Sequence, residues 1–158
     1  MAHRIDYQAA SPAGMKAVGG VYGYVMQSGL PQSLVELVYL RVSQINGCAY
    51  CVDMHSAELL KRKMPVAKIL LVAAWSESGD IFDETERAAL AWAERVTRIS
   101  EGGVPDRDYA AAASVFEAKQ LTDLTIAISL MNAYNRIAIS FGARPSGAGN
   151  QSVREQAA

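Results

Sequence analysis

Cysteine, histidine and long hydrophobic runs are scarce in this sequence. Its 158 residues include two cysteines and two histidines. The longest unbroken apolar run, from Ile69 to Trp75, is far shorter than the ~20 residues that a membrane-spanning helix needs. The first ten residues, MAHRIDYQAA, contain no apolar stretch of the kind found in secretory signal peptides. We therefore expect a cytoplasmic protein with no membrane partner.

An excess of charge of one sign is also lacking. Lys and Arg number 15 against 16 Asp and Glu, which gives a formal net charge of −1 and leaves no large basic block. Nucleic-acid-binding domains usually carry such a block, so we expect no nucleic-acid partner. Hydrophobic residues make up 51% and charged residues 20% of the chain, a composition that suits one globular domain with a substantial core.

Strand-like alternation of polar and apolar residues is absent as well, whereas helical spacing recurs along the chain. We expect a compact all-α bundle of about seven helices, in a single domain over residues 1–142. Residues 143–158 are rich in Gly, Ser, Ala and Gln and are predicted to form a disordered tail. The expected helices are 12–27, 31–45, 48–63, 65–78, 83–100, 105–119 and 123–142.

Local signals refine three of these helices. Asp83 followed by Glu86 resembles a capping box and predicts a helix start. Thr122 is the expected cap of the last helix. The segment 65–78, PVAKILLVAAWSES, is apolar nearly all round, so we expect it to be a buried helix.

The stretch NGCAYCVDMH, residues 46–55, holds both cysteines and one histidine. With Cys48 in the first turn of a helix, Cys51 and His55 fall within roughly 60° of it, so the three side chains share one stripe. Unpaired N–H groups at a helix N-terminus stabilise a thiolate, and by this argument Cys48 is the more acidic thiol. The two sulfurs can form a reversible disulfide, and His55 is placed to take a proton from Cys51.

The residues alone leave three interpretations of this stripe. A redox dithiol is favoured, because cysteines this close in a reducing cytoplasm are rarely a permanent structural disulfide. Two inert core cysteines are a second interpretation. A zinc- or ligand-binding module is a third, but a structural zinc site usually has four ligands and the stripe supplies three. Glu36 would have to be the fourth, because His3 lies in the N-terminal tail.

Glu36 lies in the apolar run SLVELVYLRV with no lysine near it in the helix. The simpler interpretation, favoured on sequence alone, is one exposed carboxylate on a mostly buried helix. The functional interpretation is a partly buried carboxylate that accepts a proton.

A longer pattern joins these residues: Glu36, eleven residues, Cys-x-x-Cys, three residues and His55, with RVSQINGC as the flanking sequence. This pattern resembles that of the alkylhydroperoxidase D-like branch of the carboxymuconolactone decarboxylase family. The segments DETERAALAWAERVT and LTDLTIAISLMNAYNRIAISF are similar to later helices of that family, so the resemblance covers most of residues 12–142. It implies an all-α, alkylhydroperoxidase D-like domain.

The resemblance implies a thiol-dependent peroxidase that reduces organic hydroperoxides. It assigns Cys51 as the peroxidatic cysteine, which becomes a sulfenic acid, and Cys48 as the resolving cysteine, which closes the disulfide. It makes Glu36 and His55 the proton relay. An external dithiol, protein or lipoyl, would recycle the disulfide, and no metal or organic cofactor is expected. The family forms homotrimers and hexamers, so a homo-oligomer is implied.

The helix-terminus argument and the resemblance disagree on which cysteine attacks. We follow the resemblance, because His55 lies one turn from Cys51 and can activate it directly. The same cysteines would also suit a disulfide reductase that acts on protein or lipoyl partners, which is the alternative function. The cysteine pair argues against lactone decarboxylation, since the decarboxylase branch does not rely on one.

Tyr50 departs from the pattern, because the best-known family members carry a histidine immediately before the second cysteine. A phenol does not shuttle protons near neutral pH as imidazole does, although its hydroxyl can orient a water molecule in the pocket.

Asn132, Asn135 and Arg136 interrupt an otherwise apolar helix pattern. We expect them to form helix–helix hydrogen bonds, or a buried arginine–carboxylate pair with Asp123 or Glu36, rather than to line the thiol pocket.

Overall fold

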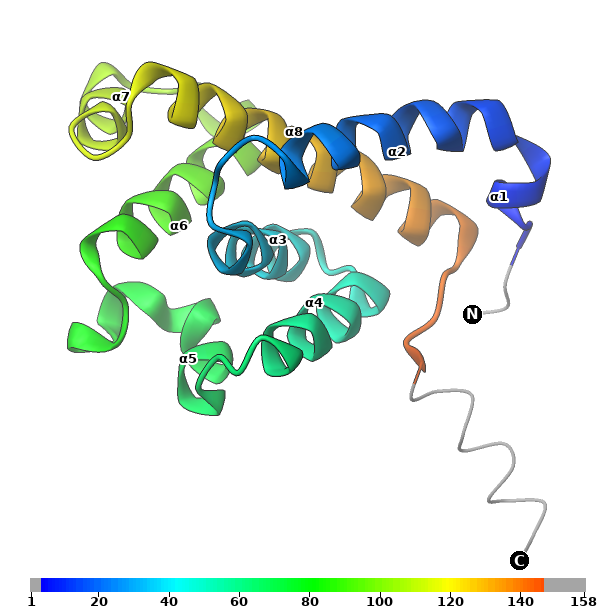
Figure 1. Ribbon diagram of the computed structural model, residues 1–158, viewed down its shortest axis with the longest axis horizontal. Helices are drawn as coiled ribbons and strands as arrows, with labels where there is room; N and C mark the ends of the chain where they lie inside the picture. The colour runs from blue at the N-terminus through cyan, green and yellow to red at the C-terminus, as the bar shows by residue number, and fades with distance from the viewer. Residues whose placement is uncertain (1–3, 147–158) are drawn as a thin grey trace, which may run out of the picture.

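Helices joined by short turns make up most of residues 4–146, the part that the structure, a computed structural model, describes. This range has no strand, and the all-α prediction is confirmed (Figure 1). It holds eight α-helices and three short 3₁₀ helices, where about seven helices were predicted. In chain order they are α1 Tyr7–Ala10, α2 Pro12–Met26, α3 Gln32–Asn46, α4 Ala49–Lys61, α5 Val66–Leu71, η1 Val72–Glu77, η2 Gly79–Ile81, α6 Glu84–Thr97, η3 Ile99–Glu101, α7 Asp106–Ala113 and α8 Ala118–Phe141.

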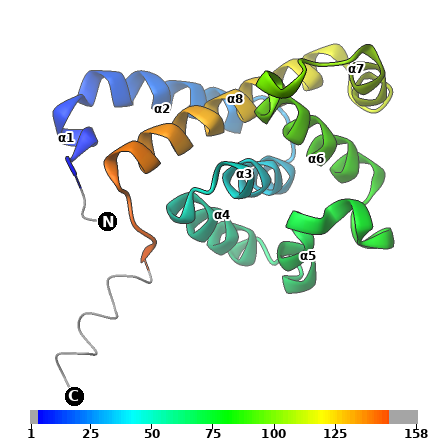
Figure 2. The same ribbon diagram turned by 180° about the vertical axis from the view of Figure 1, so that it is seen from behind.

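Helix α3 is the central element of the bundle. In Figures 1 and 2, α2 and α8 cross on one side of it, α4 runs along the other side and α6 flanks it. Nine of its fifteen residues are buried, in a run from Leu34 to Ser43 that only Arg41 interrupts. Because α4, α6 and α8 all pack on α3, even a charged residue such as Glu36 is carried into the interior.

Two apolar clusters hold the other helices against α3. One packs Val35 and Val38 of α3 against residues of α6 and α8. The other packs Leu37 and Leu40 against residues of α4, α5, η1 and α6. Each fully buried aliphatic side chain contributes on the order of 1.5–3 kcal/mol, so these clusters fix α4 relative to α3. They thereby fix the cysteine motif relative to Glu36.

The start of α6 follows the predicted capping box. The Glu86 N–H donates to Asp83 Oδ1 at 2.8 Å, and the Asp83 N–H donates to Glu86 Oε2 at 3.0 Å. Two N–H groups that a helix start would leave unpaired are thus satisfied, as the sequence predicted.

Helix α8 begins earlier than predicted, and Thr122 does not cap it. The helix starts at Ala118, where Glu117 and Gln120 form a capping box that the sequence analysis missed. Thr122 lies inside the helix, and its hydroxyl donates to the Ala118 carbonyl at 2.7 Å. The preceding helix is correspondingly shorter than predicted, since α7 ends at Ala113.

The segment 65–78 is not one buried helix, contrary to the prediction. The chain forms α5 and then η1, with non-helical backbone angles at Ala74. Val66 is 57% and Leu70 is 74% exposed, because only one side of α5 meets the rest of the bundle. Arg87 of α6 donates to three backbone carbonyls of η1 and η2, which stabilises the bend.

The C-terminal segment lies against α4 as far as Ser146. The N–H and the hydroxyl of Ser146 donate to Asp53 Oδ2 at 3.0 and 2.7 Å. The disorder predicted from residue 143 therefore does not apply to residues 143–146. The rest of the predicted tail, 147–158, lies outside the described residues, as does His3.

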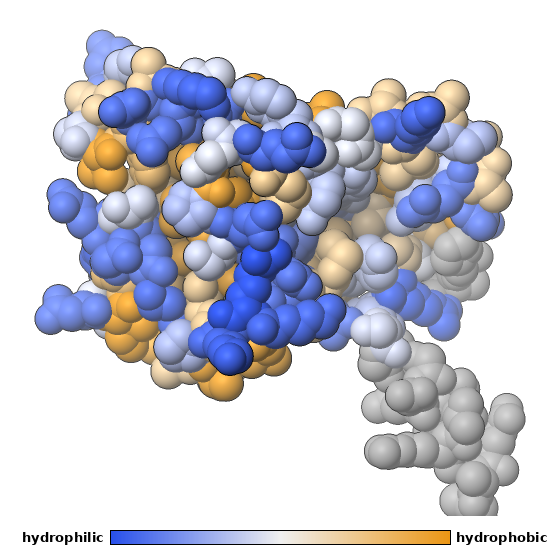
Figure 3. Space-filling view, in the orientation of Figure 1, coloured by the Kyte–Doolittle hydropathy of each residue, from blue (hydrophilic) through white to orange (hydrophobic). Residues whose placement is uncertain are grey.

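None of the described helices combines the length and apolar character needed to cross a membrane. The face shown in Figure 3 is mixed, with hydrophilic residues gathered over the carboxyl end of α4. Lys61 and Arg62 pair with Glu58 there. These two basic residues are therefore ion-paired at the carboxyl end of α4, where a positive charge also interacts favourably with the helix dipole.

Candidate active site

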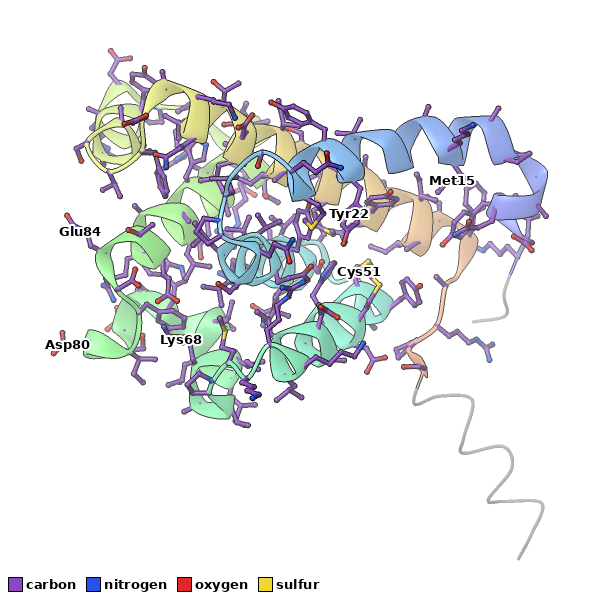
Figure 4. The ribbon with its side chains drawn as sticks, viewed as in Figure 1. Met15, Tyr22, Cys51, Lys68, Asp80 and Glu84 are labelled. Carbon is purple, nitrogen blue, oxygen red and sulfur yellow. A yellow bond between two sulfur atoms is a disulfide. The ribbon has the colours of Figure 1, made fainter. Side chains whose placement is uncertain are left out.

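A tight turn at Gly47 places the cysteines at the start of α4. Gly47 has a φ of 69°, a left-handed conformation that glycine adopts without strain, and it ends α3. Cys48 is then the N-cap of α4, and Cys51 lies in its first turn. A disulfide joins them, and the Cys51 N–H donates to Cys48 Sγ at 3.4 Å. In Figure 4 the sulfurs lie at the amino-terminal end of α4, on the side that faces α8.

His55 and Glu36 form a buried pair one helical turn from Cys51. His55 Nδ1 lies 2.7 Å from Glu36 Oε2, and the two residues are 4% and 2% exposed. The interpretation of Glu36 as an exposed carboxylate is therefore wrong. When Glu36 is ionised and the ring of His55 is neutral, Nδ1 donates to the carboxylate and Nε2 is left as the acceptor of the ring. Nε2 is buried and has no hydrogen-bond partner among the described residues.

A cavity of about 330 Å³ opens beside this pair. Glu36, Tyr50, Cys51 and His55 all line it, whereas Cys48 does not and packs near Ala138 and Ala143 instead. A small molecule in the cavity therefore contacts Cys51 and not Cys48, which favours the assignment from the resemblance over the one from the helix terminus. The other lining residues are Tyr7, Gln8, Met15, Tyr22, Met54, Glu58, Met131, Tyr134 and Ala138.

Tyr39 packs on His55, and the sequence analysis missed it. Its ring centroid lies 5.2 Å from that of His55, and its hydroxyl is buried without a partner in the described part of the chain. Burial, followed by the charge of Glu36, raises the pKa of Tyr39 above its ordinary range, so the phenol stays neutral. A signal was present, because Tyr39 follows Glu36 by three residues and so shares its helix face.

Three further tyrosines that the sequence analysis missed, Tyr7, Tyr22 and Tyr134, line the cavity from α1, α2 and α8. Partial burial is the largest cause that raises the pKa of each of them, and neighbouring tyrosines add to it for Tyr7 and Tyr134. All three remain neutral at and somewhat above neutral pH. No pattern in the sequence pointed to them, because segments far apart in the chain converge here only in the fold.

Comparison with known proteins identifies the family. The sequence matches the model of the carboxymuconolactone decarboxylase family over residues 12–95, which is more than half of the chain. The structure is similar to that of ATU0492 from Agrobacterium tumefaciens, a protein of unknown function for which a role as the antioxidant defence protein AhpD has been suggested. The TM-score is 0.88 at 40% identity, over 91% of this chain and 98% of that chain. The protein belongs to the alkylhydroperoxidase D-like (AhpD-like) branch of the carboxymuconolactone decarboxylase family.

Two further relatives extend the likeness of this AhpD-like chain. The uncharacterized protein YdfG of Bacillus subtilis (strain 168) is 36% identical over 144 residues, which cover 91% of this chain and 97% of YdfG. An uncharacterized peroxidase-related protein from Ralstonia eutropha JMP134, described as an alkylhydroperoxidase AhpD core, has a TM-score of 0.76 at 26% identity, over 88% of this chain and 74% of that chain. The family and the fold that the sequence predicted are confirmed.

The asparagines of α8 tie it to the end of α3 in this AhpD-like fold. Asn46 Nδ2 donates to Asn132 Oδ1 at 3.0 Å and to Asn135 Oδ1 at 2.9 Å. Asn135 Nδ2 donates to Ser43 Oγ at 3.1 Å. Arg136 is exposed and donates to Asn132, so the predicted arginine–carboxylate pair is wrong and the predicted helix–helix bonding is confirmed. The network fixes the turn between α3 and α4 and lies outside the cavity lining.

The residues considered for a zinc site do not gather as ligands. Within residues 4–146, no group of three or more His, Cys, Asp or Glu side chains is arranged to hold a metal ion. Cys48 and Cys51 are bonded to each other, and Glu36 engages His55 Nδ1. The arrangement is instead one for thiol and acid–base chemistry, with a sulfur in the cavity beside an imidazole that a carboxylate orients.

Proposed function

We propose that this AhpD-like protein is a thiol-dependent peroxidase that reduces organic hydroperoxides through Cys51 and Cys48. One observation carries the proposal: the buried, unpartnered Nε2 of His55 lies on a residue that lines the same cavity as Cys51. A buried polar atom without a partner costs stability, so its presence beside a sulfur points to chemistry. The similarity to a protein described as an alkylhydroperoxidase AhpD core supports the same reaction class.

The first half of the cycle uses the relay. In the reduced protein, His55 Nε2 takes the thiol proton of Cys51, and Glu36 stabilises the imidazolium through Nδ1. The thiolate of Cys51 attacks the terminal oxygen of the hydroperoxide ROOH, and the O–O bond breaks. The leaving alkoxide takes the proton from His55 and departs as the alcohol ROH. Cys51 remains as a sulfenic acid.

Cys48 completes the cycle. Its thiol condenses with the sulfenic acid of Cys51, which forms the disulfide and releases water. An external dithiol, protein or lipoyl, returns the two electrons and is itself oxidised to a disulfide. The disulfide between Cys48 and Cys51 in the structure corresponds to the oxidised end of this cycle. The cycle needs no metal or organic cofactor, and a cytoplasmic location would supply reduced dithiol.

The cysteine variants test this mechanism directly, because each leaves a single thiol in the chain. Peroxide consumption in Cys51→Ser should fall to the background rate. Cys48→Ser should consume one equivalent of peroxide and stop at a sulfenic acid that dimedone traps, as mass spectrometry would show. Full activity in Cys51→Ser would overturn the proposal.

A disulfide reductase that acts on protein partners is the alternative use of the same cysteines. Cys48 and Cys51 are each 2% exposed, and Cys51 is reached through a cavity of small-molecule size. This geometry favours a small substrate over the disulfide of a folded protein. Rates with hydroperoxides that exceed those with protein disulfides would support the peroxidase, and the reverse order would support the reductase.

A homo-oligomer, trimer or hexamer, is part of the proposal. Helix α2 is rich in apolar residues, yet only Val25 of its fifteen residues is buried within the single chain. An apolar helix face of this kind suits contact with another copy. Size-exclusion chromatography with light scattering would measure the subunit number.

A further inference from the structure

The cavity beside Cys51 has a wall unlike the rest of the interior. Of its thirteen lining residues four are tyrosines and three are methionines, and none is leucine, isoleucine, valine or phenylalanine. Those four residue types make up most of the buried core. The cavity is therefore not a packing fault in ordinary core, because its wall consists largely of aromatic faces and thioether sulfurs.

Three helices build this wall in the same way. Helices α2, α4 and α8 each contribute one tyrosine and one methionine: Met15 and Tyr22, Tyr50 and Met54, and Met131 and Tyr134. In Figure 4, Tyr22 of α2 and Cys51 of α4 lie on facing sides of the space between the two helices. Tyrosine rings and methionine sulfurs both make favourable contacts with an aromatic ring that a saturated ring of equal size does not offer. A ring in this cavity would meet such groups on three sides.

The size of the cavity excludes the smallest peroxides as good fits. Liquid water occupies about 30 Å³ per molecule, so a volume of about 330 Å³ has room for roughly eleven water molecules. Cumene hydroperoxide has nearly twice as many non-hydrogen atoms as tert-butyl hydroperoxide, so it fills correspondingly more of this space. Hydrogen peroxide would leave most of the wall without contacts.

The lining of the cavity is poorly suited to a negatively charged substrate. No lysine or arginine lines the cavity, and its two carboxylates are engaged, Glu36 with His55 and Glu58 with Arg62. Burial keeps three of its tyrosines in the neutral phenol form. A substrate carboxylate would lose its water here without gaining a lysine or arginine partner, which disfavours binding. Lys16 lines a neighbouring hollow instead.

We propose that the cavity selects uncharged aromatic hydroperoxides. This inference rests on the proposed peroxidase function and names the substrate class of the same site. The ring lies among the tyrosine and methionine side chains, and the terminal oxygen faces Cys51. Cys51 takes that oxygen as the O–O bond breaks, and the aromatic alcohol leaves with the proton that His55 Nε2 held.

Binding of product alcohols to the disulfide form tests the selection without any turnover. 2-Phenyl-2-propanol and 2-cyclohexyl-2-propanol have the same carbon skeleton, and the second has a saturated ring in place of the aromatic one. Isothermal titration calorimetry should give a Kd about fivefold lower for the phenyl compound. tert-Butanol tests size and 12-hydroxystearate tests charge, and both should bind more weakly than the phenyl compound.

A matched pair of variants tests whether the cavity wall causes the preference for the phenyl alcohol. Tyr134→Leu removes a ring from the wall and should bring the Kd ratio of the two alcohols close to one. Tyr109→Leu, at a 56% exposed position that does not line the cavity, should leave the ratio unchanged. Tyr22→Leu is a second wall variant in case Tyr134→Leu does not fold, because Tyr22 is 39% exposed and tolerates replacement more easily. Circular dichroism would verify the fold of each variant.

Equal Kd values for the two cyclic alcohols would overturn the inference. Tightest binding of 12-hydroxystearate, lost in Lys16→Ala, would also overturn it and would assign the site to carboxylate-bearing substrates. Equal kcat/KM values for cumene and tert-butyl hydroperoxides would count against the selection while leaving the peroxidase intact. Preference for the phenyl alcohol without any peroxide reduction would contradict the peroxidase and uphold the aromatic selectivity of the cavity.

Discussion

Two cavities of this protein are similar in size and opposite in chemistry. The cavity beside Cys51 measures about 330 Å³, and a second one, lined by residues of η1, α6 and α7, measures about 390 Å³. Four of the five charged side chains that line the second cavity, Glu94, Arg95, Arg98 and Asp108, form ion pairs with one another or with Arg41 just behind the wall. Arg41 Nη2 lies 2.6 Å from Glu94 Oε1, and Arg95 Nε lies 2.7 Å from Asp108 Oδ2.

The indole N–H groups of the two tryptophans that line the second cavity also have hydrogen-bond partners. Trp75 Nε1 donates to Glu94 at 2.8 Å and Trp92 Nε1 donates to Thr125 at 2.9 Å. In the smaller cavity, by contrast, the imidazole of His55 keeps Nε2 buried with neither a hydrogen bond nor an ion pair within the described chain. Asp108 Oδ2 of the second cavity also lacks a hydrogen bond, but it lies 2.7 Å from Arg95 Nε. Volume therefore does not mark the site. A buried polar atom with neither a hydrogen-bond nor an ion-pair partner, in the cavity that Cys51 lines, does mark it, because folding alone gives no reason to leave such an atom without a partner.

The largest expected effect comes from the carboxylate behind the relay. Glu36→Gln keeps an acceptor for His55 Nδ1–H but removes the charge that stabilises the imidazolium. We expect kcat/KM for cumene hydroperoxide to fall about 100-fold, the range typical of a lost acid–base group. Stopped-flow measurement with excess dithiol checks this. A variant with the wild-type kcat/KM would remove Glu36 from the proton relay.

Glu94→Gln is the matched change at the second cavity. It leaves Arg41, whose side chain is 12% exposed, without its carboxylate partner. We expect the free energy of unfolding to fall by about 1–2 kcal/mol while kcat/KM is unchanged. Urea denaturation measures the first quantity and the peroxidase assay the second. If Glu94→Gln impaired peroxide reduction as strongly as Glu36→Gln, the contrast between the two cavities would be lost.

Tyr50→His tests whether the cavity wall limits proton transfer. Tyr50 lines the cavity next to Cys51 in the chain, and an imidazole there would exchange protons near neutral pH as a phenol does not. We expect kcat/KM to rise about fivefold near neutral pH, with a pH profile that differs from that of the wild type. A pH profile identical to that of the wild type would show that Tyr50 serves only as part of the wall.

The part of the site that lies on one helix was predictable from the sequence. Cys51 and His55 share a stripe of α4 because helical geometry alone sets their relative direction. In the structure Gly47, whose left-handed conformation ends α3, sets the start of that helix just before the cysteines. That Glu36 belongs to the same site was predicted only from the family resemblance, which assigns a role to a glutamate at this spacing from the cysteines.

The sequence did not predict which side of each helix is buried by its neighbours. Glu36 was expected on the surface and is 2% exposed, while Leu70 was expected in the interior and is 74% exposed. Both helices are apolar on most sides, so their periodicity does not say which side meets a neighbour. Tyr22 and Tyr134 reach the cavity only because α2 and α8 cross over α3, which no local pattern contains.

The smallest effect concerns the hydroxyl of Tyr39, which is buried without a partner in the described residues, whereas Trp92 Nε1 donates to Thr125. Tyr39→Phe removes an unmet polar group and keeps the ring against His55. We therefore expect the free energy of unfolding to change by less than about 1 kcal/mol, whereas Trp92→Phe, which loses a satisfied bond and ring volume, should cost about 1–2 kcal/mol. Urea denaturation compares the two. Equal losses would show that the Tyr39 hydroxyl is satisfied in solution, since a water molecule bound beside the relay would then be lost with it.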